Sequence, residues 1–268
     1  MPIQCALDIL PVTREEFHAI DRIVTGVAFE GHNKFGRFLD ESLHQDEMTA
    51  RCETLGLQVS REMLIRVTHE TFVKNYFVDM LVTQGVVIET KAITTLTQHH
   101  ISQTLHYLFI TESHHGSLIN LRPSRVDRRF VSTSLTKKER CRFRIVDKGW
   151  NPVMPECHQI RDWILALLED WGAFLDFRLY RDAITHFLGG SEKVLKRLPV
   201  TSGSRVIGQQ HAHMLTNDFA FALSATKKDW KGMIDHQQRF LKHTSLAGII
   251  WINLNRHDIE FTNTPKDA

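Results

Sequence analysis

Asp79, Glu89 and Lys91 are the residues of this sequence whose types and spacing could perform chemistry. They lie in the segment Asp79-Met-Leu-Val-Thr-Gln-Gly-Val-Val-Ile-Glu-Thr-Lys91, where two apolar stretches flank Gln84-Gly85. A glycine at such a point is typical of a β-hairpin turn, which would bring the Asp79 carboxylate back towards Glu89. Because side chains alternate along a strand, Glu89 and Lys91 would share one face.

Two carboxylates beside a lysine are the groups that a divalent-metal phosphodiesterase uses. Mg²⁺ prefers oxygen ligands and retains several waters, so Asp79, Glu89 and the backbone carbonyl of Thr90 would suffice to hold it, with Mn²⁺ as the alternative ion. Lys91 would hold or help to deprotonate an attacking water and offset charge in the transition state. The alternative is a solvated strand end, since Glu-x-Lys alone recurs by chance in a charged chain.

The surrounding pattern predicts the elements that must hold this hairpin. Thr13-Arg-Glu-Glu16 is a capping box, and apolar residues then recur at helical spacing up to Gly36. A second helix is expected over about 39–55, strands near 58–65, 71–82 and 86–93, a helix over about 98–111, and strands at 117–120 and 129–132. This order indicates an α/β fold.

The composition is that of an ordinary globular protein of 268 residues, which is long enough for one large or two modest domains. No segment is as long and apolar as a membrane span, and no secretory signal is visible, so we expect a cytoplasmic protein without membrane contact. The four cysteines are scattered without a Cys-x-x-Cys pair, which favours reduced thiols over a zinc knuckle or a disulfide framework.

A basic segment follows the hairpin. The net charge of +2 is too small to indicate nucleic-acid binding by itself, but between Arg122 and Arg144 only Asp127 and Glu139 oppose a run of cations. The candidate phosphate-binding residues are Arg122, Arg125, Arg128, Arg129, Lys137, Lys138, Arg140 and Arg142. Such contacts would bind nucleic acid with an affinity that falls steeply with salt, and a solvated linker is an equally good explanation.

Several short blocks occur in one order within about residues 18–133. They are the run from Val24 to Ser42, Asp79-Met-Leu-Val, Val87-Ile-Glu-Thr-Lys-Ala92, Gln103-Thr-Leu-His-Tyr-Leu108 and Leu118-Ile-Asn120. Together these blocks resemble the GxxExxY family of the PD-(D/E)XK nuclease-like superfamily. The resemblance implies a restriction-endonuclease-like domain, with a mixed central sheet flanked by helices. It also implies that the catalytic residues are Glu41, Asp79, Glu89, Lys91 and Gln103, with Glu41 as a further metal ligand.

The sequence departs from the family at the motif that gives the family its name. In Phe38-Leu-Asp-Glu41-Ser-Leu-His44, Phe38 stands at the glycine position and His44 at the tyrosine position, so that only Glu41 is retained. Val78 stands at the position of the superfamily's proline. The implied metal-binding residues are complete whereas the entry to the helix differs, so the resemblance implies a reaction class and no particular substrate.

The second half of the chain repeats the first. The residues from Phe35 to Met48 align without gaps on those from Trp171 to Ile184, at an offset of 136 residues. The segments 103–111 and 118–121 align on 236–244 and 251–254, both at an offset of 133. Ordered blocks at nearly constant offsets indicate two tandem copies of one unit, the second over about residues 140–264.

The second copy lacks every candidate catalytic group. Glu41 maps to Phe177, Asp79 to His213, Glu89 to Ala222, Lys91 to Ser224 and Gln103 to His236. The expected domains are residues 1–136 with the site, 137–155 as a linker and the start of the second unit, and 156–268 as a degenerate domain. We expect the two domains to pack as a pseudo-dimer, or the second to bind a protein partner or a further copy of the chain.

The sequence therefore predicts a Mg²⁺-dependent nuclease that hydrolyses DNA or RNA through its first domain, with an inactive second copy in a structural or binding role. A nucleic-acid-binding module without turnover and a protein-interaction scaffold are the alternatives. The complete set of two acids and a lysine favours the enzyme, because a scaffold has no need to hold two carboxylates together against their repulsion.

Overall fold

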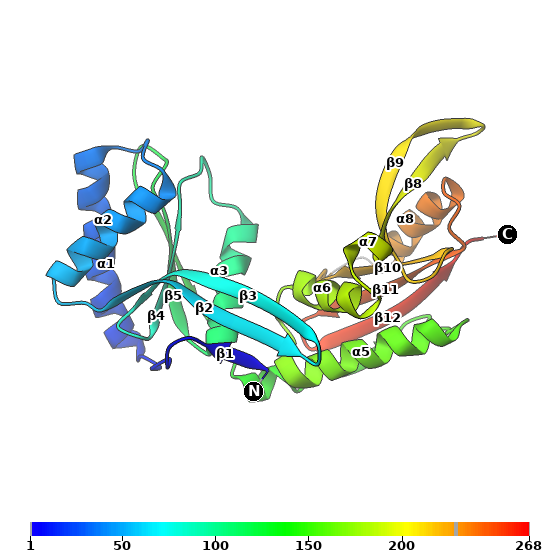
Figure 1. Ribbon diagram of the computed structural model, residues 1–268, viewed down its shortest axis with the longest axis horizontal. Coiled ribbons are helices and arrows are strands. Elements are labelled where there is room, and N and C mark those ends of the chain that lie inside the picture. Colours follow the sequence, from blue (N-terminus) through cyan, green and yellow to red (C-terminus); the bar gives the residue numbers. More distant parts are fainter. Residues whose placement is uncertain (1, 228–229, 268) are drawn as a thin grey trace. The chain divides into compact units, whose positions relative to one another are not determined.

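The computed structural model describes residues 2–227 and 230–267. The chain forms two compact units, Met1–Glu139 and Arg140–Ala268, and each contains a six-stranded mixed sheet with helices packed on it (Figure 1). The predicted fold class, α/β with two tandem sheets flanked by helices, is confirmed.

Unit 1 is a single sheet with three helices. Its strands are β1 (Ile3–Cys5), β2 (Val59–His69), β3 (Phe72–Val82), β4 (Val86–Lys91), β5 (His115–Asn120) and β6 (Asp127–Ser132), and its helices are α1 (Arg14–Phe35), α2 (Glu41–Thr54) and α3 (Gln98–Thr111). The strands lie side by side in chain order, and only β4 and β5 run parallel. A parallel pair needs a crossover connection, which α3 provides.

The helix signals of the sequence act as predicted. α1 begins after Thr13, whose side chain accepts a hydrogen bond from the Glu16 N–H while the Glu16 carboxylate accepts one from the Thr13 N–H. α1 ends before Gly36, whose φ of 76° suits a residue without a Cβ. α3 has the predicted bounds. The strands β2 to β6 differ from the predicted ones by a few residues at their ends, and β1 was not predicted.

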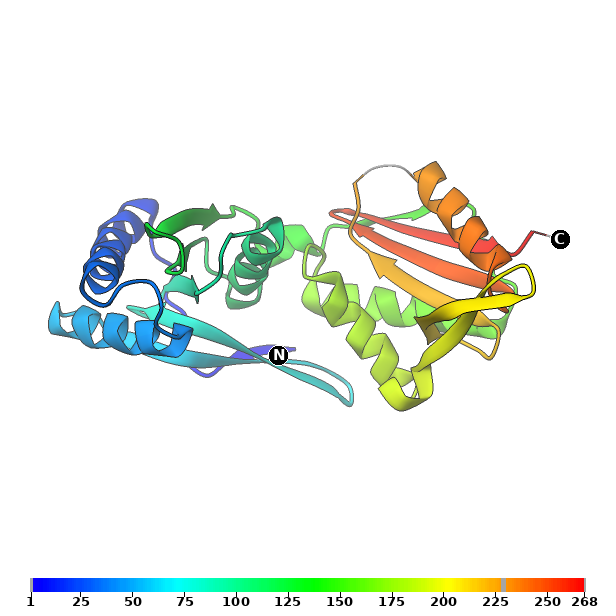
Figure 2. The same ribbon diagram turned by 90° about the horizontal axis from the view of Figure 1, so that it is seen from above.

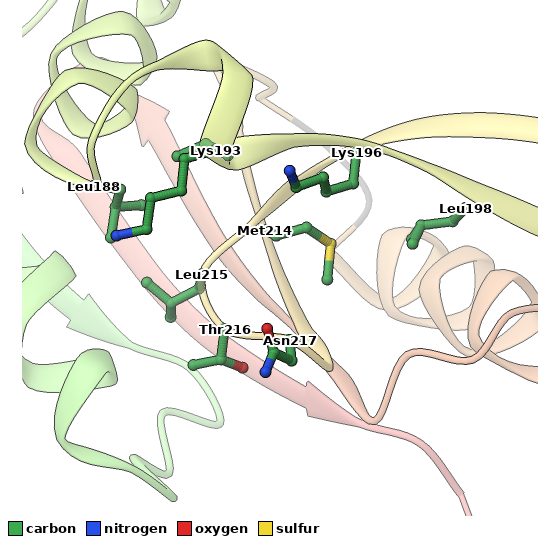
Figure 3. A pocket seen from close by; sticks show the side chains of 9 residues that line it. Leu188, Lys193, Lys196, Leu198, Met214, Leu215, Thr216 and Asn217 are labelled. Atoms are coloured by element: carbon green, nitrogen blue, oxygen red, sulfur yellow. The ribbon is translucent and has the colours of Figure 1, made fainter.

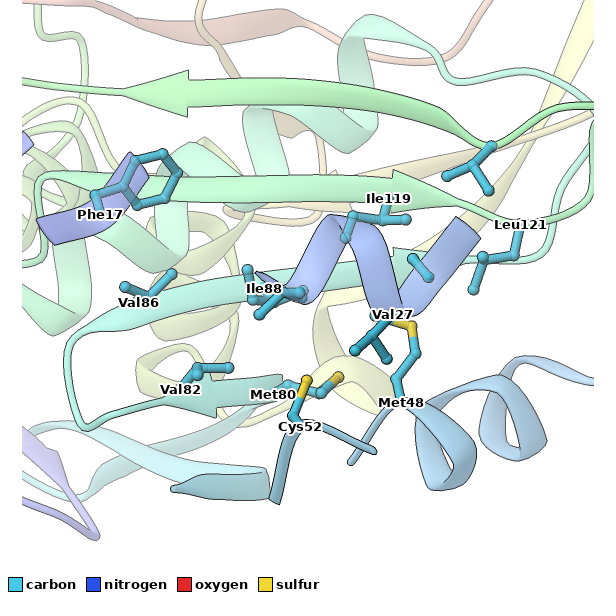
Figure 4. Close-up of a cluster of buried hydrophobic side chains, with 13 residues drawn as sticks. Phe17, Val27, Met48, Cys52, Met80, Val82, Val86, Ile88, Ile119 and Leu121 are labelled. Atoms are coloured by element: carbon cyan, nitrogen blue, oxygen red, sulfur yellow. The ribbon is translucent and has the colours of Figure 1, made fainter. Parts of the chain in front are cut away.

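The hydrophobic core of unit 1 lies between the sheet and the helices α1 and α2 (Figure 4). Val27 and Met48 from these helices pack with Met80 of β3 and Ile88 of β4. α3 covers the opposite face of the sheet, as Figure 1 shows. Because successive side chains of a strand point to opposite faces, Glu89 projects to the α3 side while Ile88 enters the core.

Unit 2 contains the remaining elements. Its strands are β7 (Arg144–Asp147), β8 (Leu195–Ser202), β9 (Arg205–Met214), β10 (Phe219–Ser224), β11 (Gly248–Asn255) and β12 (Asp258–Pro265), and its helices are α5 (Pro155–Trp171), α6 (Phe177–Phe187), α7 (Ser191–Val194) and α8 (Trp230–Lys242), with α4 (Lys137–Arg140) at the boundary. Figure 2 shows α8 on one side of this sheet and α5 and α6 on the other. The strand order is β8-β9-β10-β11-β12-β7.

The two sheets share one arrangement. The strands β2 to β6 correspond to β8 to β12 in order and direction, including the single parallel pair within each series. Their registers agree as well, because Glu89 pairs with Leu118 and Ala222 pairs with Trp251, and both members of the second pair lie 133 residues after those of the first. The offset found in the sequence is therefore also an offset of strand register.

A side-chain contact repeats at the same offset. The Asn120 side chain accepts from the Ile93 N–H at 3.1 Å and donates to the Ile93 carbonyl at 2.8 Å. Asn253 forms the same pair of hydrogen bonds with Thr226, at 2.9 and 2.8 Å. In each unit this asparagine fixes the chain just beyond the strand that carries, in unit 1, the candidate site.

The units differ in their sixth strand. β1 pairs with β2 at one edge of the first sheet, whereas β7 pairs with β12 at the opposite edge of the second. The sequence predicts a linker and the start of the second unit over residues 137–155. Within that segment residues 144–147 form β7, because the edge of β12 offers hydrogen bonds that an extended segment can complete, and the boundary between the units falls after Glu139.

In the described residues of the chain, no helix is long and apolar enough to cross a membrane. All four cysteines are free thiols. The cytoplasmic location stays a prediction.

The close approach of β4 and β5 predicts a stability effect at Gly116. A Cβ at this position would lie 2.7 Å from the Val87 carbonyl oxygen, and backbone cannot move aside easily. Gly116→Ala should therefore lower the free energy of unfolding by about 1–3 kcal/mol, measured by thermal unfolding.

Gly26 provides the matched control. It is exposed within α1, and a Cβ there would meet no atom within 4 Å. Gly26→Ala should raise the stability by up to about 1 kcal/mol, because alanine favours the helix more than glycine does. Equal effects of the two substitutions would contradict the packing argument.

Candidate functional site

The candidate site lies where β3 and β4 separate. The last pair of their antiparallel ladder is Met80 with Ile88, so the neighbouring residues Asp79 and Glu89 are the first that are not paired with each other. Beyond this pair the Asp79 carboxylate connects the two strands. Its Oδ2 accepts hydrogen bonds from the Thr90 N–H at 2.8 Å and from the Thr90 hydroxyl at 3.3 Å. The Asp79 N–H in turn donates to Glu89 Oε1 at 3.3 Å. These bonds hold the two carboxylates side by side.

The Lys91 ammonium lies among three carboxylates. Its Nζ is 3.4 Å from Asp79 Oδ2, 3.6 Å from Glu89 Oε2 and 3.5 Å from Glu41 Oε1. It also donates to the Thr90 carbonyl at 2.6 Å. Glu41 reaches this point from the first residue of α2, and its Oε2 accepts from the backbone N–H that follows Lys91 at 3.1 Å. Charged side chains from α2, β3 and β4 therefore meet around the Lys91 ammonium.

Burial perturbs the ionisation of this cluster. Glu89 is 1% exposed, and within the described residues its Oε2 has no hydrogen-bond partner. Burial, and next the Asp79 carboxylate, raise the pKa of Glu89 well above its ordinary value. Burial alone would lower the pKa of Lys91, but the Glu89, Asp79 and Glu41 carboxylates outweigh burial and leave that pKa raised.

These residues fit a hard divalent cation. Asp79, Glu89 and Glu41 offer carboxylate oxygens and Thr90 offers its carbonyl, which are the donors that Mg²⁺ prefers. Three carboxylates and one ammonium leave a formal charge of −2, which a divalent cation would cancel. Among the residues that the structure describes, no group of three or more His, Cys, Asp or Glu is arranged to hold a metal. Lys91 Nζ stands between the three carboxylates, so a cation would have to displace it.

Gln103 lies outside the cluster. From α3 its Nε2 donates to the Tyr107 hydroxyl at 3.4 Å. Burial, and next the Glu89 carboxylate, raise the pKa of Tyr107 to about 12, so the charge of the site acts on Tyr107 of α3. Of the five residues implied by the family resemblance, the structure brings together Glu41, Asp79, Glu89 and Lys91 and leaves Gln103 beside Tyr107.

Sequence reasoning missed a polar support behind the site. Gln45 is buried, and its Nε2 donates to the Thr90 hydroxyl at 2.7 Å. Arg61 of β2 donates to Gln45 Oε1 at 2.8 Å. The signal that could have identified Gln45 is its spacing, because it follows Glu41 by four residues on one helix and so lies on the same face.

The basic segment does not form one surface. Arg140 is 1% exposed and donates to the carbonyls of Trp171 and Ala173, so the prediction that it binds nucleic acid is wrong. Its charge is used to close the turn after α5 in unit 2. Arg128 forms an ion pair with the buried Asp21.

The other basic residues of the segment vary in exposure. Arg129 pairs with Asp127 at 3.4 Å, and the Arg122 Nε donates to the Ala92 carbonyl at 3.2 Å. Arg125, Lys138 and Arg142 are exposed and Lys137 is half-buried. The segment also crosses the boundary between the units, so its binding role stays a prediction for the exposed members alone.

The corresponding positions of unit 2 are neutral. By strand register, Ala222 and Ser224 take the places of Glu89 and Lys91. The Ser224 hydroxyl accepts from Trp251 Nε1 at 2.9 Å and donates to Asn253 Oδ1 at 2.8 Å. Hydrogen bonds between neutral groups therefore replace the ionic cluster.

The register also corrects one assignment of the sequence alignment. Met80 pairs with Ile88, and His213 pairs with Phe221. His213 therefore corresponds to Met80, and Ala212, rather than His213, stands at the position of Asp79. Both residues lack a carboxylate, so the correction leaves the difference between the units unchanged.

Comparison with known proteins identifies one similarity. Residues 18–131 match the model of a family described as the PD-(D/E)XK nuclease superfamily. This region contains all four residues that converge at the end of β4. No curated protein matches the chain significantly, and no solved structure does so either.

The raised pKa of Glu89 predicts that this side chain destabilises the metal-free protein. A carboxyl whose pKa is higher in the folded than in the unfolded state weakens the fold as the pH rises from its ordinary value of 4.5 through the raised value. Glu89→Gln should therefore raise Tm at pH 7 without divalent cations by a few degrees, on the order of 1 kcal/mol. The difference in Tm between the parent and the variant should shrink at pH 4, where the Glu89 carboxyl is mostly protonated and so as neutral as glutamine.

Calorimetry in a chelating buffer provides the measurement. Glu53→Gln is the control, because Glu53 is an exposed carboxylate at the other end of α2. Added Mn²⁺ should stabilise the parent protein more than Glu89→Gln. A variant less stable than the parent at pH 7 would contradict this account of Glu89.

Proposed function

We propose that unit 1 is a divalent-metal-dependent nuclease that hydrolyses phosphodiester bonds in DNA or RNA. The observation that carries the proposal is the convergence of Asp79, Glu89 and Glu41 on one point around Lys91. The match of this region to the PD-(D/E)XK nuclease superfamily supports the same activity. The fold does not require these charges, because unit 2 places neutral residues at the same register positions.

The residues would share the work as follows. Asp79, Glu89 and the Thr90 carbonyl would hold the cation, and Glu41 would add a further carboxylate. Bound there, Mg²⁺ or Mn²⁺ supplies Lewis-acid stabilisation of the charge that develops on the phosphoryl oxygens. Lys91, with its raised pKa, stays protonated and donates hydrogen bonds to a water or to a phosphoryl oxygen. This geometry favours Lys91 as a donor over Lys91 as a base.

Burial fits this division of roles. Glu89 is almost inaccessible to water, so only Lys91 and a cation bound in the site can balance its charge, and such a cation would meet the carboxylate oxygen that lacks a hydrogen bond. Glu41 and Asp79 are less buried and leave an approach for substrate. In this proposal Gln103 and Tyr107 of α3 flank that approach.

We further propose that unit 2 is a degenerate copy of unit 1 in a structural or binding role. It keeps the strand order, the register and the asparagine contact, and it has neutral residues in place of the ionic cluster. The finer assignment to the GxxExxY family stays a prediction. So do the packing of the domains as a pseudo-dimer and the binding of a protein partner or a further copy.

Cleavage of labelled single-stranded and double-stranded DNA and RNA tests the proposed activity. The full-length protein should cleave at least one of them with Mg²⁺ or Mn²⁺ and none with a chelator. Glu89→Ala and Lys91→Ala should lower the rate at least about 100-fold, because each removes a group that stabilises charge in the transition state. Each variant should bring activity to background if unit 2 is inactive, as proposed here.

Glu53→Ala is the control, with an expected rate within about twofold of the parent, and circular dichroism should show that every variant is folded. Metal-independent cleavage, or cleavage that survives both site substitutions, would exclude this site. Salt-sensitive binding without any cleavage would instead favour the binding module. A stable protein complex that both substitutions leave intact, without nucleic-acid binding, would favour the scaffold.

A further inference from the structure

The hairpin of β8 and β9 rises from the sheet of unit 2 as a curved ribbon (Figure 1). Seven consecutive residues of β9, 205–211, are exposed, and β8 forms the open edge of the sheet. Val206 and Ile207, close to the turn, are each 58% exposed. The equivalent hairpin of unit 1 is partly covered, because β1 pairs with β2 and several residues of both strands are buried, although Val73 and Phe77 of β3 are exposed.

The ribbon is also uniformly basic. No Asp or Glu occurs between Lys193 and Asn217, whereas the segment holds Lys193, Lys196, Arg197 and Arg205. Within the described residues none of these four cations forms an ion pair. The β2–β3 hairpin of unit 1 is different, since acidic residues lie among its cations. Unit 2 therefore presents positive charge on a projecting element whose equivalent in unit 1 has mixed charge and is partly covered.

Strand register places hydrogen-bond donors on one face of the ribbon. Arg197 pairs with His211 and Pro199 with Gln209, so Arg197, His211 and Gln209 share a face. Arg197 Nε donates to His211 Nε2 at 3.1 Å, which orients the guanidinium across the ribbon. Guanidinium and amide groups match phosphate oxygens and the acceptors at base edges.

The open edge is unsuited to another protein strand. Pro199 lacks an N–H, and Lys196 and Arg197 place two adjacent cations on the edge. A bulge at Val200 and Thr201 interrupts the register and bends the ribbon. These features prevent strand addition, so the exposed ribbon is not explained by a β-sheet partner.

The base of the hairpin continues the basic surface. A cavity of about 220 Å³ there is lined by Lys193, Lys196, Thr216 and Asn217, together with apolar residues (Figure 3). The Lys196 ammonium donates to the Glu192 carbonyl at 2.9 Å, which leaves two of its protons for other acceptors. Ammonium, hydroxyl and amide groups around one opening suit a phosphate oxygen.

We propose that the β8–β9 hairpin is a docking ribbon for double-stranded DNA, which it enters through the major groove. The proposal rests on the proposed function for its choice of a nucleic acid. A two-stranded ribbon, with strands about 5 Å apart, fits the B-form major groove, which is about 12 Å wide. The deep, narrow major groove of an RNA duplex excludes it. The cations contact phosphates, while Gln209, Val206 and Ile207 face the bases.

This inference gives unit 2 its binding role and identifies the substrate as duplex DNA. It also explains how the chain binds a polyanion although Arg128 and Arg140 of the predicted basic segment are committed to internal contacts. Unit 2 supplies affinity for the duplex, and unit 1 supplies chemistry.

Fluorescence anisotropy of the full-length protein with a labelled 24-base-pair DNA duplex, in a chelating buffer, tests the inference. A triple variant, Lys196→Gln, Arg197→Gln and Arg205→Gln, should weaken duplex binding at least tenfold at about 150 mM salt. The slope of log K against log salt should fall by about 2 to 3, because each lost phosphate contact contributes about 0.9. A second variant, Val206→Ser with Ile207→Ser, should weaken binding with the slope unchanged.

The matched control removes three exposed cations from α8 of the same unit, through Lys231→Gln, Arg239→Gln and Lys242→Gln. It changes the net charge equally and should alter duplex binding less than threefold. Equal losses for the two triple variants would overturn the docking ribbon, as would single-stranded DNA or an RNA duplex binding as tightly as the DNA duplex.

Cleavage assays on the same variants separate this inference from the proposed function. If the triple hairpin variant loses duplex binding and neither the parent nor any variant shows metal-dependent cleavage, the docking ribbon is kept and the nuclease is rejected. Metal-dependent cleavage that needs Glu89, with duplex binding unchanged in the hairpin variant, would keep the nuclease and reject the ribbon.

Discussion

Thr90 has no partner on β3, because the last pair of β3 and β4 is Met80 with Ile88, and the Asp79 carboxylate accepts a hydrogen bond from the Thr90 N–H instead. This single bond ties one acid to the backbone beside a second, the buried Glu89. Two neighbouring carboxylates repel each other, so their closeness requires a compensating charge, which Lys91 provides from the same strand. The core beneath, where Met80 and Ile88 pack, holds both strands together up to the point of separation.

The second unit has the same separation of strands without the acidic residues. β9 and β10 also separate immediately beyond their last pair, His213 with Phe221. The next positions, which hold Asp79 and Glu89 in unit 1, are here Ala212 and Ala222. The opening is a cavity of about 500 Å³, lined mostly by aromatic, apolar and uncharged polar groups that include Trp251 and Ser224, with Arg181 as a cation and, among the described residues, no carboxylate. The same backbone arrangement thus supports a cluster of carboxylates in the first unit and, within the part of the chain that the structure describes, a pocket without carboxylates in the second.

An ionic site of this kind works against stability. Burial of Glu89 removes it from water, and its Oε2 gains no hydrogen bond in return. Natural proteins keep such a group where function needs it, because selection acts on activity once the fold is stable enough. The hydrogen bonds of Ser224 with Trp251 and Asn253 join neutral groups and lack this penalty.

The sequence by itself determined the ends of α1 and α3, the hairpin turn before β4 and the repeat, because caps, turns and alternation act over a few neighbouring residues. It also indicated the residue types of the site. Only the tertiary structure decided that Glu41 meets Lys91, that Gln103 turns to Tyr107, that Arg140 is buried and that Ala212 replaces Asp79. Burial, ion pairing and strand register depend on residues distant in the chain, so local pattern could not fix them.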